Sequence, residues 1–585
     1  MGFVAKLNEA VAKSPVGRWF KLQGSGTNKE RANTRFSSEI RAGVATFVTM
    51  AYIISVNSTI ISQTGGTCEC NPPPGATGSE ALCIGDPVYE ACVNVIKHDL
   101  ITGTAAIACI ACIAMGFFAN LPFALAPGMG INAYFTYTVV GFHGSGKVPY
   151  RTALAAVCIE GIIFVILSAI GIRQWLARLI PNSIKVATGA GIGLYLCFIG
   201  LQSSAGIGLI TADSATLVTL GGCAPSHKNS QGVCQSGRME GPTVWMGILG
   251  FFLITMLTLF RVKGAVLCGI LVVAITSWFR GTPVTHFPYT PEGNEAFDFF
   301  KKVITFHPIQ HTLAAFDFGL NHSEVWVALF TMLYVDILDA TGTMFSMAKF
   351  GGFTKDNGDF EGMGMAFIVD GCTIIIGSVF GVSPVTVFVE SGAGITDGGR
   401  TGITAITVGF FFFISLFLAP IFASIPPWAT GPALIVIGSM MTKSVKDINW
   451  DYLGDAVPAF LTIALMPLTY SIAYGLIAGI GSYIAINLTA WLVVRASCGR
   501  ITLDRSQKEA WNNFRMDDGQ RILAPWIIRL KNKMFGKQKL CGAGNDQEPL
   551  SGNPQHREST RPRGKRVELY SPDEAKTSEN LFGEG

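Results

Sequence analysis

Five acidic residues lie inside long apolar stretches of the sequence and are the first candidates for chemistry. They are Glu160, Asp336, Asp339, Asp370 and Glu390. A charge at the centre of a bilayer costs about 2.5–3.5 kcal/mol on insertion scales, so such residues usually serve a function. No Lys or Arg lies deep in the same stretches to pair with them. For Glu160 and Asp370, each of which stands alone, a helix cap or a hydrogen bond to a neighbouring hydroxyl is an equal alternative.

The other three acids combine in a more specific pattern. Asp336 and Asp339 are three positions apart, which places them on one face of a helix. Glu390 follows Pro384 and precedes Gly392, so it belongs to an interrupted helix. Neighbouring buried carboxylates can load and release a proton and can accept hydrogen bonds from the N–H groups of a substrate. We therefore expect all three to take part in substrate binding or proton coupling.

A second interrupted segment reads Ala-Pro-Gly-Met-Gly-Ile-Asn over 126–132. Pro127 has no backbone N–H, and Gly130 tolerates unusual backbone angles. A half-helix that begins near Gly130 would point its free N–H groups at a ligand. Asn132 adds one donor group and one acceptor. The alternative is a simple proline kink with a packed Asn.

The chain contains an internal duplication. Residues 49–59 (TMAYIISVNST) align without a gap to residues 331–341 (TMLYVDILDAT). The second copy places Asp336 and Asp339 where the first has uncharged residues. Two further matches are RTALAAV at 151–157 with RTGITAI at 400–406, and Ala187-Thr188-Gly189 with Ala429-Thr430-Gly431. The duplication predicts two structural repeats, with the function placed where the copies differ in charge.

The composition is that of an integral membrane protein. Of 585 residues, 49% are hydrophobic and only 14% are charged, and the mean hydropathy is +0.42. Soluble domains have about 25% charged residues. The segment 1–35 is rich in Lys and Arg and has no apolar core of a signal peptide. By the positive-inside rule, we expect a cytoplasmic N-terminus in a multi-pass protein of the plasma membrane.

Apolar runs predict an all-α polytopic fold with 14 transmembrane segments. The expected spans are 40–62, 99–119, 128–142, 151–171, 184–204, 243–260, 264–280, 323–348, 363–377, 386–396, 402–422, 430–444, 457–471 and 473–495. Each repeat holds about seven segments, and an odd number inserts the second copy upside down. Inverted repeats with interrupted helices near the midplane are typical of secondary transporters.

These spans predict three regions along the chain. Residues 1–38 form a cytoplasmic N-terminal segment, 39–498 form the transmembrane domain, and 499–585 form a polar, largely disordered cytoplasmic tail. Six of the 14 cysteines lie in two hydrophilic loops. They are Cys68, Cys70, Cys83, Cys92, Cys223 and Cys234. Even numbers in loops that face outward indicate disulfides, whose pairing in the first loop the sequence leaves open.

Several function classes are disfavoured. Gly141–Lys147 nearly matches a phosphate-binding loop, but Val148 stands where Ser or Thr would bind Mg²⁺. The histidines form no HExxH motif, so we expect no metal, no other cofactor and no enzymatic activity. No basic patch with interleaved aromatic residues indicates a nucleic-acid partner.

Several segments of the chain resemble a known family. Five segments are similar to the AzgA-like purine transporters of fungi and plants, within the nucleobase–ascorbate transporter group. They are RAGVATFVTMAYIISVN (41–57), NLPFALAPGMGINAYFTYTVVGFHGSG (120–146), YVDILDATGT (334–343), SPVTVFVESGAGITDGGRTGITAI (383–406) and MPLTYSIAYGLIAGIGSY (466–483). The resemblance covers nearly residues 35–495 and is closer to the fungal members.

The resemblance implies a fold and a function. The fold would have 14 segments in two inverted repeats with short strands in segments 3 and 10. Its core domain would cover about 39–171 and 323–422, and its gate domain about 172–280 and 428–495. The function would be proton-coupled import of adenine, guanine and hypoxanthine by a homodimer. A transporter of purine analogues or cytokinins, or an anion transporter of the same fold, is the alternative.

The resemblance also carries a site onto this sequence. Gly130 and Asn132 in the third segment, Asp336 and Asp339 in the eighth and Glu390 in the tenth match the substrate-site motifs of the family. We expect Asp336 or Glu390 to hold the base through its N–H groups. One of Asp336, Asp339 and Glu390, with Asp339 preferred, would carry the coupling proton.

Overall fold

The computed structural model gives the chain as a bundle of helices with a few short strands. It describes residues 3–27, 30–70, 83, 86–171, 181–202, 206–213, 216–224, 227, 234, 236–262, 264–319, 323–353 and 360–497. The expected cytoplasmic tail, 499–585, lies outside the described residues.

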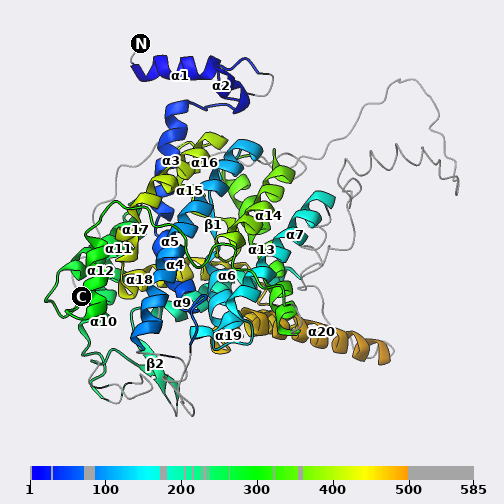
Figure 1. The fold of residues 1–585 in the computed structure, drawn as a ribbon. Coiled ribbons are helices and arrows are strands. Elements are labelled where there is room, and N and C mark those ends of the chain that lie inside the picture. The colour runs from blue at the N-terminus through cyan, green and yellow to red at the C-terminus, as the bar shows by residue number, and fades with distance from the viewer. Residues whose placement is uncertain are drawn as a thin grey trace, which may run out of the picture. The chain divides into compact units, whose positions relative to one another are not determined.

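The elements follow one another along the chain as Figure 1 labels them. The helices are α1 (Phe3–Lys13), α2 (Pro15–Trp19), α3 (Phe36–Met50), α4 (Ile53–Ser62), α5 (Pro87–Ala114), α6 (Met129–Tyr134), α7 (Tyr150–Ile170), α9 (Asn182–Leu201), α10 (Pro242–Leu259), α11 (Ala265–Trp278), α12 (Pro291–Phe300), α13 (Ser323–Phe350), α14 (Met363–Val379), α15 (Ser391–Thr396), α16 (Gly402–Ser415), α17 (Ala419–Ala423), α18 (Pro427–Thr442), α19 (Leu453–Leu468) and α20 (Ile472–Ala496). The strands are β1 (Leu125–Pro127), β2 (Ile210–Asp213), β3 (Leu217–Leu220) and β4 (Val385–Val387).

Seven helical stretches in the described part of the chain are long and apolar enough to cross a membrane. They are Phe36–Ser62, Pro87–Ala119, Tyr150–Ile170, Asn182–Leu201, Pro242–Leu259, Ser323–Phe345 and Ile472–Ala496. Four shorter apolar helices, α11, α14, α16 and α19, accompany them. The chain is therefore an integral membrane protein.

Polar caps fix where several of these helices begin. Asp86 accepts a hydrogen bond from the N–H of Val88 at 3.0 Å, and Pro87 occupies the first position of α5. This cap starts the helix 12 residues before the apolar run that the sequence indicates at 99. The side chain of Ser471 caps α20 in the same way. An unpaired helix N-terminus leaves backbone donors without partners, and these side-chain oxygens satisfy some of them.

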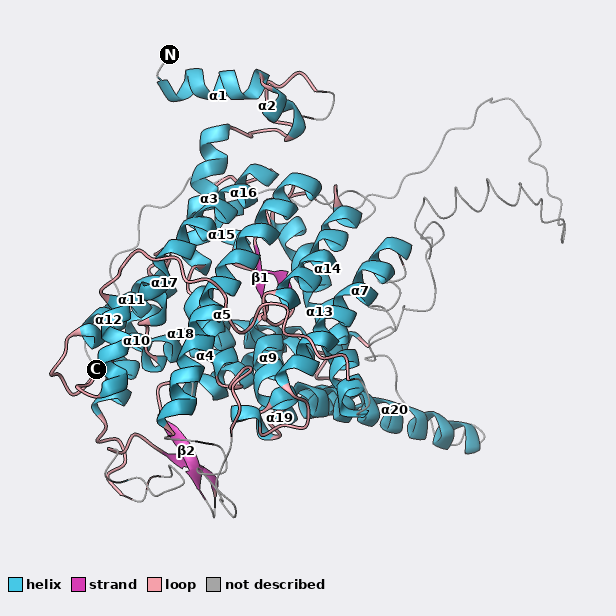
Figure 2. Cartoon of the chain, in the orientation of Figure 1, coloured by secondary structure: helices cyan, strands magenta, loops and turns pink. Residues whose placement is uncertain are grey.

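The two interrupted segments meet in the middle of the helices. β1 pairs antiparallel with β4, so that Leu125 lies opposite Val387 and Pro127 opposite Val385 (Figure 2). The N–H of Gly128 extends the pairing by donating to the carbonyl of Pro384 at 2.9 Å. Each strand is fully buried and leads into a short helix, α6 or α15. The pairing satisfies backbone groups that would otherwise be unbonded at this depth.

The long helices pack in two sets. One set comprises α3, α4, α5, α7, α13, α14 and α16 together with β1 and β4. The other set comprises α9, α10, α11, α18, α19 and α20. Small residues allow close packing within each set, as at Gly161 of α7, where an added Cβ would lie 2.7 Å from Ile375 of α14.

The first apolar run is not one continuous helix. The sequence predicts a single span over 40–62, whereas α3 ends at Met50 and α4 begins at Ile53. Tyr52 occupies the break between them, where the N–H of Ser55 bonds to its carbonyl at 3.2 Å in a tighter turn. No Pro or Gly marks this position, so the pattern of residue types gave no signal of it.

Three disulfides close the hydrophilic loops. They join Cys68 to Cys92, Cys70 to Cys83, and Cys223 to Cys234. The expectation of disulfides in both loops is confirmed, and the pairing in the first loop is now defined. The strands β2 and β3 form a hairpin just before the third disulfide, an element that the sequence did not predict.

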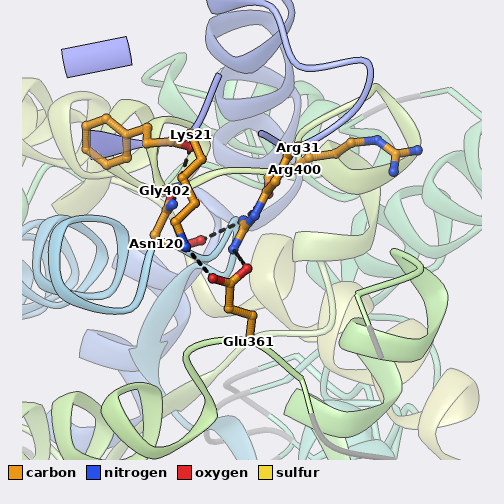
Figure 3. Close-up of polar contacts among 7 residues, drawn as sticks. Lys21, Arg31, Asn120, Glu361, Arg400 and Gly402 are labelled. Carbon is orange, nitrogen blue, oxygen red and sulfur yellow. Dashed lines mark hydrogen bonds and ion pairs between the residues drawn. The ribbon is translucent and has the colours of Figure 1, made fainter. Parts of the chain in front are cut away.

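The N-terminal segment is tied to the helix ends by a polar cluster (Figure 3). Arg31 donates to the carbonyl oxygens of Asn120 at 2.8 Å and Arg400 at 2.5 Å. Glu361 forms ion pairs with Arg31 and with Lys21. Burial acts to raise the pKa of Glu361, but the hydrogen bond from Lys21 and the charge of Arg31 outweigh it and hold the pKa below its ordinary value. The cluster therefore holds four separate segments of the chain together.

Candidate substrate-binding site

A cavity of about 540 Å³ lies between the two sets of helices. Its lining comes from α6, α9, α13, the end of α18 and the turn that follows, and the residue before Glu390. The lining residues are Gly130, Ile131, Asn182, Lys185, Val186, Thr188, Gly189, Ile192, Val335, Leu338, Asp339, Thr341, Gly342, Thr343, Val389, Met441, Ser444 and Asp447. A volume of this size suits a small organic molecule.

Two of the predicted site residues line this cavity, and a third follows a lining residue in the chain. Gly130 and Asp339 line it directly. Glu390 follows Val389, which also lines it, and begins the half-helix α15. The carboxylates of Asp339 and Glu390 are near enough to interact electrostatically. The structure thus brings an acid of α13, which lines the cavity, close to an acid of the second interrupted segment.

Glu390 and Asn132, each next in the chain to a residue that lines the cavity, have buried polar atoms without partners within the described residues. One carboxylate oxygen of Glu390, Oε1, accepts a hydrogen bond from the hydroxyl of Tyr52 at 2.7 Å. The other oxygen, Oε2, is buried and has no hydrogen-bond partner within the described residues. Neither amide atom of Asn132, which follows the lining residue Ile131, has a partner there. Buried polar atoms are nearly always hydrogen-bonded, so these atoms, each next in the chain to a lining residue, are candidates for bonding a polar ligand.

The remaining acids lie away from the lining. Asp336 is fully buried in α13, one helical turn from Asp339, and does not line the cavity. Glu160 of α7 and Asp370 of α14 are also fully buried and outside the lining. The sequence grouped Asp336 with Asp339, but only Asp339 lines the cavity.

Other polar residues of the site were not predicted. Lys185 and Asn182 lie in the first turn of α9 and line the cavity, as does Asp447 beyond α18. Thr188 and Gly189 line it one turn further along. Residues 187–189 attracted notice only as a repeated motif, so their repetition was the available signal. Tyr52 gave no signal, because it lies in the repeat copy without acids.

Gly130 allows a close approach between the two sets of helices at this site. A Cβ atom on Gly130 would lie 2.5 Å from the side chain of Ile192 on α9. Cβ atoms do not approach another atom so closely, so the Ile192 side chain or one of the helices would have to shift. The glycine therefore permits the present spacing of α6 and α9 at the cavity wall.

The opposite end of α9 is closed by a cluster of aromatic residues around Tyr470. The hydroxyl of Tyr470 bonds to the side chain of Gln202 at 2.7 Å. Its carbonyl accepts a hydrogen bond from Thr138 at 2.7 Å. The rings of Tyr137 and Tyr195 pack edge-on against it, with centroids 5.4 and 5.3 Å away. At this end of α9, the two helix sets are therefore in direct contact through Tyr470.

Paired interrupted helices, unsatisfied polar atoms and a cavity between two helix sets define a membrane transporter for a small polar molecule. Residues 81–477 match the model of the Permease family, which comprises xanthine/uracil permeases. The chain belongs to this family.

Three relatives illustrate the similarity. The chain is 54% identical over 555 residues to "Efflux pump notK'" of Aspergillus versicolor, covering 94% of both chains. It is 52% identical to "Putative xanthine/uracil permease C887.17" of Schizosaccharomyces pombe, covering 90% of this chain and 84% of that one. It is 34% identical to "Guanine/hypoxanthine permease PbuO" of Bacillus subtilis, covering 77% of this chain and 91% of that one.

Among solved structures, the transmembrane domain of the cyanobacterial bicarbonate transporter BicA is similar with a TM-score of 0.46 and 14% sequence identity. The match covers 77% of this chain and 98% of that chain.

Proposed function

We propose that this protein is a proton-coupled symporter that imports purine nucleobases, namely adenine, guanine and hypoxanthine. The carrying observation is that Asp339 lines a cavity of about 540 Å³ and interacts electrostatically with Glu390, whose oxygen Oε2 has no hydrogen-bond partner within the described residues. A purine presents N–H donors along its edge, and carboxylates accept such donors. The guanine/hypoxanthine permease of Bacillus subtilis, which is 34% identical, supports the choice of substrate.

In this proposal, Glu390 and Asn132 hold the base. Oε2 of Glu390 accepts one N–H, and the amide of Asn132 offers a donor and an acceptor to the same ring edge. Asp339 carries the coupling proton, because it lines the cavity and lies near a second carboxylate. Asp336, one turn behind it, is fully buried and serves as the inner partner in proton transfer.

The proposed architecture has 14 transmembrane segments in two inverted repeats. The set with α3, α4, α5, α7, α13, α14 and α16 is the core domain, and the set with α9, α10, α11, α18, α19 and α20 is the gate domain. Both termini are cytoplasmic in the plasma membrane, and the protein is a homodimer. The cavity then opens to the cytoplasm at the start of α9. Movement of the core against the gate exposes the site to each side in turn.

The test is uptake of radiolabelled hypoxanthine and adenine by cells without their own purine carriers, at two external pH values. We expect Asp339→Asn and Glu390→Gln each to lower high-affinity uptake at least tenfold at normal surface levels. Glu324→Gln is the control, because Glu324 is half-exposed at the start of α13 and pairs with the exposed Lys147. Normal uptake in either acid variant would refute the site. A wild type that carries no purine, but carries a cytokinin or an anion from the competition panel, would refute the substrate.

Export is a second candidate, favoured by the Aspergillus versicolor relative, whose name is that of an efflux pump. Cells preloaded with labelled purine distinguish the two directions. Import against a gradient that collapses with a protonophore supports the symporter. Faster loss of label from cells with the protein, without accumulation, supports export.

A further inference from the structure

The hydroxyl of Tyr52 is the hydrogen-bond partner of the Glu390 side chain. It donates to Oε1 of Glu390 at 2.7 Å, and the tyrosine side chain is only 2% exposed. The two residues are far apart in sequence: Tyr52 lies between α3 and α4, and Glu390 lies between β4 and α15. A hydrogen bond to a carboxylate is among the stronger ones, because the acceptor is charged.

The backbone on both sides of this bond is specialised. Tyr52 lies where α3 has ended and α4 has not begun, and it is preceded by Ala51 in the same turn. Glu390 lies between β4 and α15, with backbone angles of −60° and −17° that already belong to the helix. The bond therefore joins two helix interruptions, and each interruption fixes the direction of one partner.

The consequence falls on the second carboxylate oxygen. With Oε1 engaged by the phenol, the rotation of the carboxyl group is fixed, and Oε2 is left without a partner within the described residues. A carboxyl group without that restraint could rotate and satisfy itself elsewhere. The phenol thus keeps one acceptor available for a ligand.

We propose that Tyr52 is a positioning residue, which holds the carboxylate of Glu390 so that its second oxygen is presented to the purine. This inference rests on the proposed function. It assigns a role to the repeat copy 49–59, which lacks the acids of the other copy. Each copy of the repeat then contributes to the site, one with acids and one with the group that orients an acid.

The duplication supplies a matched control. Tyr334 occupies the position in 331–341 that Tyr52 occupies in 49–59. Its hydroxyl is buried, and the side chain with which it interacts is Thr188 rather than an acid. Tyr334→Phe therefore removes the same atom from the equivalent position without touching Glu390.

The first experiment compares purine uptake by Tyr52→Phe, Tyr334→Phe and wild type. We expect Tyr52→Phe to raise KM about tenfold, as loss of one hydrogen bond to a charged group does. The maximal rate per transporter at the surface should change less than twofold, because the acids remain. Tyr334→Phe should match wild type. Unchanged KM in Tyr52→Phe, or an equal rise in Tyr334→Phe, overturns the proposal.

A second measurement does not depend on purine transport. The purified protein is treated with a hydrophobic carbodiimide, and labelling of the peptide that contains Glu390 is followed by mass spectrometry. We expect Tyr52→Phe to be labelled severalfold faster, because the phenol no longer covers Oε1, and Tyr334→Phe at the wild-type rate. If Tyr52→Phe is labelled faster but the wild-type protein transports no purine, the proposed function is refuted and the positioning role is not. Equal labelling in all three proteins refutes the positioning role.

If Tyr52→Phe alone does not reach the membrane, the double variant Tyr52→Phe/Glu390→Gln can be used instead. This variant replaces the carboxylate that would otherwise lose its hydrogen bond from Tyr52. If Tyr52 acts through Glu390, purine binding by the purified double variant equals that of Glu390→Gln. A further tenfold loss in the double variant overturns the proposal.

Discussion

At the residue scale, Gly130 is the position where the smallest change should have a large effect. Gly130→Ala places a methyl group 2.5 Å from the side chain of Ile192, so this side chain or the helices α6 and α9 must shift at the cavity wall. We expect purine uptake to fall at least fivefold with normal surface expression, since overpacking typically costs about 1–3 kcal/mol. Uptake kinetics of purified protein in vesicles measure the effect.

Two companion variants make this test specific. Gly364→Ala is the control, because a Cβ at Gly364 meets nothing within 4 Å. Gly130→Ala combined with Ile192→Ala restores the space and should recover much of the uptake. A Gly130→Ala protein with wild-type kinetics, or no recovery in the double variant, would contradict the spacing role.

The sequence reached part of the site because charge and backbone interruption leave a clear pattern. Asp339, Glu390 and Gly130 were predicted from acids in apolar runs and from Pro and Gly inside them; Asp339 and Gly130 line the cavity, and Glu390 follows the lining residue Val389. Asp336 shares the pattern but points into the interior, because residues three apart on one face can still differ in depth. Tyr52 could not be found, since its role depends on a contact with a residue 338 positions away.

At the element scale, Glu39 shows how a buried acid can serve structure alone. Its carboxylate accepts hydrogen bonds from the N–H groups of Arg400 at 3.0 Å and Thr401 at 3.1 Å, and from the hydroxyl of Thr404 at 2.6 Å. It therefore caps the N-terminus of α16 from another helix. The sequence did not single out Glu39, because it lies at the edge of its apolar run.

Glu39→Gln should lower stability without changing substrate affinity. The amide group would face a backbone donor, and an unsatisfied buried donor costs about 1–3 kcal/mol. We expect the melting temperature in detergent, followed by size-exclusion chromatography after heating, to fall by about 2 °C or more. Glu324→Gln, which breaks only a surface ion pair, should change it by less. Equal melting temperatures for Glu39→Gln and wild type would contradict the capping role.

The sequence predicted some of the helices and strands and missed others, and the difference has physical reasons. Long apolar helices such as α7 and α9 follow from composition, because the bilayer requires their length. The start of α5 at Pro87 and the break at Tyr52 did not follow, since local caps and tertiary contacts decide them. The hairpin of β2 and β3 was missed as well, because a polar loop carries no comparable periodicity.

At the scale of the whole molecule, the two ends of α9 differ. The cavity lies at the end that begins with Asn182, and the contact of Tyr470 with Thr138 lies at the other. In the proposed cycle, this contact joins core to gate and must open when the site faces outward. Its strength should therefore set how often the outward side is accessible.

Thr138→Val tests this contact, because it removes the hydrogen bond to the carbonyl of Tyr470 and keeps the shape of the side chain. The reporter is Leu201→Cys, which replaces the half-buried last residue of α9. A membrane-impermeant maleimide added to whole cells should label this cysteine severalfold faster in Thr138→Val. Thr255→Val is the control, since among the described residues the Thr255 hydroxyl bonds only to the carbonyl of Phe251 in its own helix. The same labelling rate in all three backgrounds would show that the Tyr470 contact does not hold the outward side closed.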